Sequence, residues 1–173
     1  MTALARDMDF VPFAEPSEYP VLRGEKFPVF KRIQMEPLAT MRPNPGPSEP
    51  GRMSIGTYNY RAGRPEFIAD IHLVPNRTGT TLEQMQALFP GKLNPAHNAK
   101  WTRLGVLPPI AVSDTFACAF QGQKMKARVA LVLLPPANDI IVVHFNYPES
   151  DSKARAVYEK ASESMLQSIE LMK

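Results

Sequence analysis

The sequence contains few of the residues that mark a disulfide-stapled or membrane-spanning protein. Its 173 residues include one cysteine, so no disulfide can form within the chain. That residue, Cys118, lies in an apolar run and is expected to pack as a small hydrophobic side chain. No stretch approaches the roughly 20 consecutive apolar residues of a transmembrane helix, and residues 1–19 lack the apolar core of a signal peptide. We therefore predict no transmembrane segment. The chain as written is expected to be cytoplasmic, or periplasmic or in the envelope if a signal peptide has been removed.

Signatures of enzymes are also scarce in this sequence. The glycines do not form a phosphate-binding loop before a helix, and no Gly-x-Ser-x-Gly motif occurs. Ser113, Asp114 and His144 supply the residue types of a nucleophilic triad, but neighbouring hydroxyl and carboxyl groups in a turn are more often a local cap. The sequence therefore predicts neither an enzyme nor a bound cofactor.

The net charge of +3 is a small and dispersed excess of positive side chains. Its densest group, Lys124, Lys126 and Arg128, alternates along one face of a predicted strand. A nucleic-acid platform would interleave aromatic side chains with these charges, and this face has none, so we predict no binding of nucleic acid. A solvated strand edge explains the row, and an acidic protein partner is its functional alternative.

Proline is abundant, with 18 residues, and its placement divides the chain. It is dense in residues 36–51, which excludes a helix or a central strand there and predicts a long exposed loop. This loop is either a mobile insertion or a polyproline II segment that docks a partner. We predict an extended N-terminal arm over residues 1–26, followed by a single domain over residues 27–173 that includes the loop.

Apolar periodicity predicts a series of strands and two helices. The predicted strands are residues 53–61, 66–74, 100–107, 110–121 with a break around Ser113 and Asp114, 124–134 and 139–147. Thr80 and Glu83 fit a capping box before a short helix that ends at Pro90. A long terminal helix is predicted over residues 148–172, because apolar residues recur there at three- and four-residue spacing.

The order of these elements resembles that of a known family. A hairpin, a short helix, a strand with the only tryptophan, a three-stranded meander and a final helix follow one another over residues 53–172. The sequence YPES precedes the final helix, and Ser164, Ser168 and Ile169 lie at its end. This pattern is similar to that of the PsbP-like superfamily, which includes the extrinsic photosystem protein, Ran-binding import factors, DcrB-like lipoproteins and Eag-type secretion chaperones. The resemblance implies an α+β fold, an αβα sandwich with a central antiparallel sheet of five to seven strands and a long C-terminal helix. It also implies a family whose members mostly bind proteins.

We therefore predict a non-catalytic protein that binds or helps to assemble another protein, as a secretion-related chaperone or an envelope lipoprotein-like module would. Tyrosine and arginine dominate the energetics of many interfaces, and the row of basic side chains would suit an acidic partner. The predicted partner-binding residues are Tyr58, Tyr60, Arg61, Arg64, Lys124, Lys126 and Arg128. The sequence leaves the identity of the partner and the oligomeric state open.

The alternative is a small-molecule or metal-binding protein, or an enzyme. Asp70 and His72 share a face of one predicted strand and His144 lies on another, so the three side chains could meet as ligands for zinc or copper. Three unrelated side chains on a polar sheet face explain the same pattern. The remaining histidine, His97, is expected to be a loop residue.

Overall fold

The computed structural model describes residues 22–43, 49–59, 64–105, 107–120, 122–149 and 152–173. Within them the main element is an eight-stranded sheet in which all neighbouring strands are antiparallel. Its order is β3-β4-β5-β10-β9-β7-β6, and β8 pairs with β9 beside β7. The strands are β3 (Arg42–Pro43), β4 (Arg52–Asn59), β5 (Arg64–Val74), β6 (Trp101–Leu104), β7 (Ile110–Ser113), β8 (Phe116–Phe120), β9 (Gln123–Leu134) and β10 (Asp139–Pro148).

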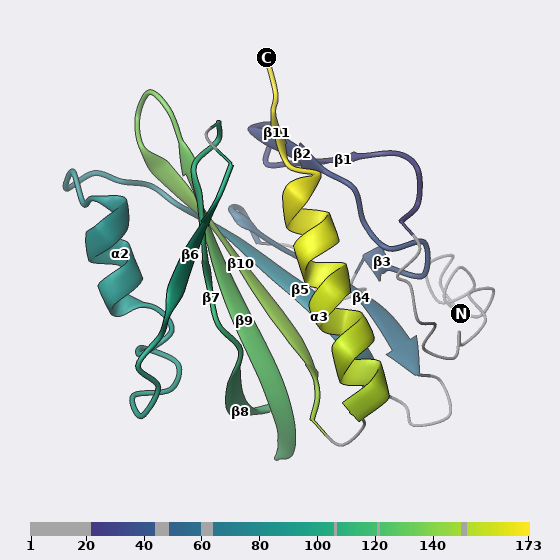
Figure 1. The fold of residues 1–173 in the computed structure, drawn as a ribbon. Helices are drawn as coiled ribbons and strands as arrows, with labels where there is room; N and C mark the ends of the chain where they lie inside the picture. The colour runs from purple at the N-terminus through teal and green to yellow at the C-terminus, as the bar shows by residue number, and fades with distance from the viewer. Residues whose placement is uncertain (1–21, 44–48, 60–63, 106, 121, 150–151) are drawn as a thin grey trace.

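A smaller sheet joins the first described segment to the C-terminal end of the chain (Figure 1). Its three strands are β1 (Phe27–Val29), β2 (Ile33–Met35) and β11 (Glu170–Leu171), with β2 in the middle. The main-chain N–H of Glu36 donates a hydrogen bond to the Ser168 hydroxyl at 2.8 Å. The segment before the large sheet is therefore attached to the end of the chain.

Two helices cover opposite faces of the large sheet (Figure 1). α3 (Ser152–Gln167) contacts β10, and α2 (Leu82–Leu88) contacts β9. Along β10, Val143 packs in the hydrophobic cluster that includes residues of α3, whereas Val142 packs in the cluster that includes residues of α2. Because successive side chains of a strand point to opposite faces, β10 must be apolar on both. Among the described residues, no helix has the length and the apolar character that crossing a membrane requires.

A stack of aromatic rings ties α3 to the sheet. The Phe67 ring on β5 lies 5.7 Å from the Phe145 ring on β10 and 5.0 Å from the Tyr158 ring on α3, measured between ring centroids. Phe67 and Phe145 are fully buried. Such ring pairs contribute about 0.5–1.5 kcal/mol each beyond the area that they bury. The stack therefore holds the helix over the two strands.

The α+β class, the antiparallel sheet and the long C-terminal helix are confirmed, but the predicted number of strands is too low. The sequence predicts five to seven, and the large sheet has eight. Residues 110–121 form two strands rather than one, and Arg42–Pro43 adds a strand at the edge. Both are short pieces for which apolar alternation is a weak signal.

The helix boundaries also differ from the predicted ones. The capping box of α2 is made by Thr81 and Gln84, one residue after the predicted pair. β10 continues through Pro148, and α3 ends at Gln167 before the chain enters β11. Ile169 is buried although it lies beyond the helix. Ile169 continues the apolar spacing of the helix, so the sequence predicted a longer helix than the structure has. The residues that follow Ile169 pair with β2 instead.

The proline-rich segment is only partly as predicted. Leu38 and Met41 are buried in the cluster on the α3 side, so the prediction of an exposed loop is wrong at these two positions. Arg42–Pro43 pairs with β4 at the edge of the sheet, where proline is tolerated. Residues 44–48 and most of the predicted arm lie outside the described residues. The boundaries of the arm and of the domain stay predictions.

The variant Phe67→Ala should lower the free energy of unfolding by roughly 3–5 kcal/mol, because it leaves a cavity between two rings that cannot close it. Urea unfolding followed by circular dichroism measures this change. Leu88→Ala is the control, since Leu88 is 53% exposed and its truncation should cost less than about 0.5 kcal/mol. Equal losses in the two variants would contradict the role of the stack.

Candidate functional site

The predicted partner-binding residues are spread over two regions of the sheet. Tyr58 lies on β4 and Arg64 on β5, close together at one end of this hairpin, because Asn59 pairs with Arg64. Tyr60 and Arg61 lie outside the described residues. The position of this group as a partner-binding surface stays a prediction.

The basic row on β9 lies on the side of the sheet that α3 covers. Arg128 Nη1 donates to Ser162 Oγ at 3.2 Å and lies 3.3 Å from Glu163 Oε1, both on α3. The Arg128 side chain is only 13% exposed. Lys126 Nζ lies 3.9 Å from Glu149 Oε1, whereas Lys124 is exposed. Arg128 therefore links the sheet to the helix, and the row does not form one open surface.

The structure brings Asp70, His72 and His144 to one sheet face, as the alternative prediction required. His144 on β10 lies directly opposite Asp70 on β5, and His72 Nε2 lies 3.9 Å from Asp70 Oδ1. Arg52 Nη2 approaches the other oxygen of Asp70 at 3.5 Å. Within the described residues, however, no three His, Cys, Asp or Glu side chains are arranged to hold a metal ion. The geometry does not support the metal site.

His144 is the most perturbed group of this face. Burial lowers the pKa of its imidazole from 6.5 to about 4, with Asp70 acting to raise it and His72 to lower it. Its Nε2 atom and Asp70 Oδ1 are buried without a hydrogen-bond partner among the described residues. The neutral imidazole packs against the Phe116 ring at 6.5 Å. His144 therefore carries a neutral imidazole at the pH of the cell, with its Nε2 atom shielded from solvent.

The residues of the possible triad do not assemble either. The Ser113 hydroxyl is buried and accepts a hydrogen bond from Val129 N at 3.0 Å. Asp114 pairs with His97 rather than with His144, at 2.8 Å between His97 Nε2 and Asp114 Oδ1. His97 lies in a loop, as predicted, but its contact with Asp114 was not predicted. The spacing of 17 residues gives no local signal for it.

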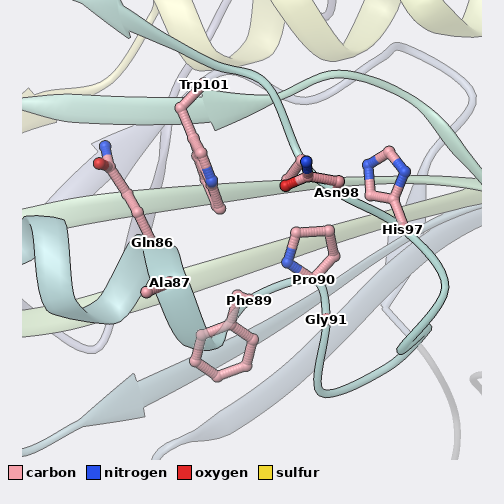
Figure 2. Close-up of a pocket in the computed structure, with 9 residues that line it drawn as sticks. Gln86, Ala87, Phe89, Pro90, Gly91, His97, Asn98 and Trp101 are labelled. Carbon is pink, nitrogen blue, oxygen red and sulfur yellow. The ribbon is translucent and has the colours of Figure 1, made fainter.

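His97 lines a pocket between α2, the loop that follows it and β6. We name this the Trp101 pocket; its volume is about 210 Å³. The lining residues are Gln86, Ala87, Phe89, Pro90, Gly91, His97, Asn98, Ala99 and Trp101. Figure 2 shows the Trp101 ring reaching from its strand into the space beside Gln86, with Phe89 and Pro90 across from it. The pocket thus offers apolar ring and aliphatic surface together with two side-chain amides.

A second hollow lies at the other end of β6. It has a volume of about 310 Å³, and Arg103 contributes to it from the strand. Its lining residues are Thr80, Thr81, Leu82, Glu83, Arg103, Pro109, Leu133 and Asn138. The two hollows therefore flank the same short strand on its α2 side.

Large apolar side chains are exposed at a few positions of the described chain. Leu88 is 53% exposed, Leu93 50% and Leu107 71%. One other large apolar residue, Met172, is counted as exposed among the described residues. Leu88 and Leu93 lie in the segment of the chain that contributes the lining of the Trp101 pocket, although neither lines it, and Leu107 follows β6. Leu88 is exposed although it continues the three-residue spacing of Leu82 and Met85, which are buried on α2.

The stability of the protein should depend on the protonation of His144. The folded-state pKa of about 4 lies below the unfolded value of 6.5, so the unfolded chain binds the additional proton between these values. Stability should therefore be unaffected by His144 above about pH 6.5 and fall by roughly 2–3 kcal/mol as the pH drops toward 4. His144→Phe should remove this part of the pH dependence, as measured by urea unfolding across that range.

His72→Gln is the matched control for that experiment, because the His72 side chain is on the same face but 40% exposed. The carboxyl of Asp139, whose pKa is lowered by hydrogen bonds from Asn76 N–H and Arg32, also loses stabilisation in acid, but equally in both variants. The same pH dependence in His144→Phe and in the wild type would show that His144 is not the neutral group inferred above.

Comparison with solved structures identifies the fold. The Ran-binding protein Mog1p of Saccharomyces cerevisiae superposes with a TM-score of 0.59 at 10% sequence identity, over 86% of this chain and 95% of that chain. A protein of Bacteroides thetaiotaomicron superposes with a TM-score of 0.57 at 14% identity, over 87% of this chain and 49% of that chain, so this chain spans about half of its length. No family model and no curated protein matches the sequence. The predicted resemblance is thus confirmed as a likeness of fold to a Ran-binding protein.

Proposed function

We propose that the protein is a non-catalytic binding protein, which docks another protein on the surface around the Trp101 pocket. The observation that carries this proposal is that exposed Leu88 and Leu93 lie in the segment that contributes the pocket, while a third exposed leucine, Leu107, follows β6. Burying a leucine side chain contributes about 1.5–3 kcal/mol, so a partner that covers these residues would gain substantial stability. Tryptophan is enriched among the residues that anchor interfaces, and Trp101 lines this pocket.

The size of the pocket favours a protein ligand over a small molecule. Small-molecule sites usually enclose about 300–1,000 Å³. The Trp101 pocket, at about 210 Å³, is smaller than that range. It has room for one apolar side chain of a partner, with Gln86 and Asn98 available to bind main-chain groups beside it.

The fold supports the same class of function. Mog1p, which shares the fold, is a Ran-binding protein. A likeness of fold gives no partner to this chain, but it shows that the architecture is used to bind a protein. A secretion-related chaperone or an envelope accessory protein is the more specific form of this proposal, and the identity of the partner decides between them.

The hairpin end with Tyr58, Tyr60, Arg61 and Arg64 is a second proposed contact surface, together with Lys124 and Lys126. Tyrosine and arginine would again be the anchors there, and the basic side chains would favour an acidic partner. Tyr58 and Arg64 lie on β4 and β5, toward the edge of the sheet opposite β6, whereas Lys124 and Lys126 lie on β9. The two surfaces can therefore be tested separately.

Trp101→Ala and Leu93→Ser should each weaken partner binding about 30-fold or more, because the loss of an interface anchor costs roughly 2 kcal/mol or more. Cross-linked partners from the native host are identified by mass spectrometry with the wild type. Each purified candidate is then titrated against the variants by calorimetry. Met172→Ser is the matched control, since Met172 is an exposed apolar residue outside residues 88–107.

A partner that binds Trp101→Ala and Leu93→Ser as tightly as the wild type would overturn the assignment of this surface. If Arg64→Ala weakened that same complex, the hairpin end would be the contact surface instead. Unchanged thermal unfolding of each variant shows that a loss of binding does not come from a loss of fold.

A further inference from the structure

Among the residues that the structure describes, strand β6 is the last strand of the large sheet and has β7 as its single neighbour. Asp114 N donates to Lys100 O at 2.8 Å, so Lys100 and Asp114 form a hydrogen-bonded pair at the start of the β6–β7 ladder. In an antiparallel ladder such pairs alternate with pairs whose N–H and C=O groups point outward. The N–H and C=O groups of Trp101 and Arg103 are therefore directed away from β7.

This outer edge of β6 is open in the part of the chain that the structure describes. No hydrogen bond between described residues reaches the outward main-chain groups of Trp101 or Arg103. Unpaired strand edges are templates for the addition of a further strand. A segment of a partner could therefore extend the sheet here through main-chain hydrogen bonds.

The two hollows lie where the side chains of an added strand would need them. Trp101 and Arg103 both direct their side chains to the α2 side, where Trp101 packs near Leu82 and Arg103 Nη2 lies 2.5 Å from Glu83 Oε1. Alternate side chains of a strand are about 6.8 Å apart and lie on the same face. One side chain of an added strand would thus face the Trp101 pocket. The side chain two residues further along that strand would face the hollow beside Arg103.

The charges along this edge select the chemistry of the added segment. Lys92 and Lys100 are exposed, and neither has an ion-pair partner among the described residues. Of the acidic groups nearby, Glu83 is paired with Arg103, whereas His97 offsets the charge of Asp114 only when it is protonated. Lys92, Lys100 and Arg103 therefore stand against two carboxylates, which leaves a small positive excess when His97 is neutral. Charged side chains on an edge strand oppose unspecific pairing, and here they would admit acidic segments and reject basic ones.

We propose that β6 accepts an extended segment of a partner protein as a ninth strand, with acidic side chains toward solvent and an apolar side chain in the Trp101 pocket. This inference rests on the proposed function and deepens it, because it states the mode of docking and the class of partner segment. Main-chain pairing gives the affinity, while the pocket and the lysines give the selectivity.

The test uses a pooled library of synthetic peptides of about nine residues, in which acidic or basic residues alternate with apolar ones. Peptides retained by the immobilised wild-type protein are sequenced, and the most enriched one is titrated. Trp101 is the only tryptophan, so its fluorescence reports occupation of the pocket. Hydrogen exchange of the Trp101 and Arg103 amides reports pairing at the edge.

The discriminating variants are Arg103→Pro and Arg103→Ala. Both remove the guanidinium and its contact with Glu83, but only proline removes the outward N–H at this position. The inward ladder with β7 is left intact in both, because the Arg103 N–H does not donate to β7. The difference between the two variants therefore measures main-chain pairing alone. Thermal unfolding checks that both retain the fold.

We expect enrichment of acidic over basic peptides, slower exchange of the Trp101 amide, and affinity at least about tenfold weaker in Arg103→Pro than in Arg103→Ala. No enrichment, enrichment of basic peptides, or equal affinities of the two variants would overturn strand addition. If the two variants bind with equal affinity, the proposed function would still hold for a host partner whose binding requires Trp101 and Leu93. A partner that requires neither residue would remove the proposed function from this surface as well.

Discussion

The burial of both faces of β10 is the constraint on which the rest of this structure depends. Val142 and Val143 are neighbours on the strand and are buried in two different clusters, so the strand needs a layer on each side. On one side α3 supplies it with 16 residues and the aromatic stack on Phe67. On the other side α2 has only 7 residues, so it covers only part of that face of the sheet.

The shortness of α2 explains where polar and hollow features occur. On the α2 side of β5, Asp70 and His72 remain partly exposed, and Arg52 reaches across to them. At the other end, the loop that follows α2 is the wall of the Trp101 pocket. A longer helix would bury these positions, as α3 does on the opposite face. The candidate site thus exists because α2 covers only part of its face of the sheet.

The sequence predicted those parts of the fold in which burial follows a regular period. Residues 139–147 are apolar at nearly every position, and they form the central strand β10 as expected. The alternation of residues 124–129 and the continuous apolar run after it correspond to one partly exposed end and one covered end of β9. These elements were predictable because the spacing of apolar side chains along the sequence indicates which of them are buried.

Long-range pairing could not be read in this way. The segment Glu170–Leu171 falls within the bounds of the predicted terminal helix, but it pairs with β2, more than one hundred residues earlier. The break between β7 and β8 was located correctly at Ser113 and Asp114, whereas the partner of Asp114 was not, since His97 is brought to it by tertiary structure. Exposure of Leu88 was missed for the same reason: periodicity identifies an apolar stripe but not where its cover ends.

The contacts of Asp114 show why the β6 edge is suited to recognition. Its Oδ1 atom lies 2.8 Å from His97 Nε2 and accepts a hydrogen bond from Lys100 N at 3.2 Å, which fixes the residue before β6. The His97 ring in turn stacks on Phe116 at 4.8 Å, and Phe116 is buried against the sheet. The edge is thus anchored to the core before any partner arrives. Because an ordered edge loses little conformational freedom on binding, even a strand of four residues can contribute to affinity.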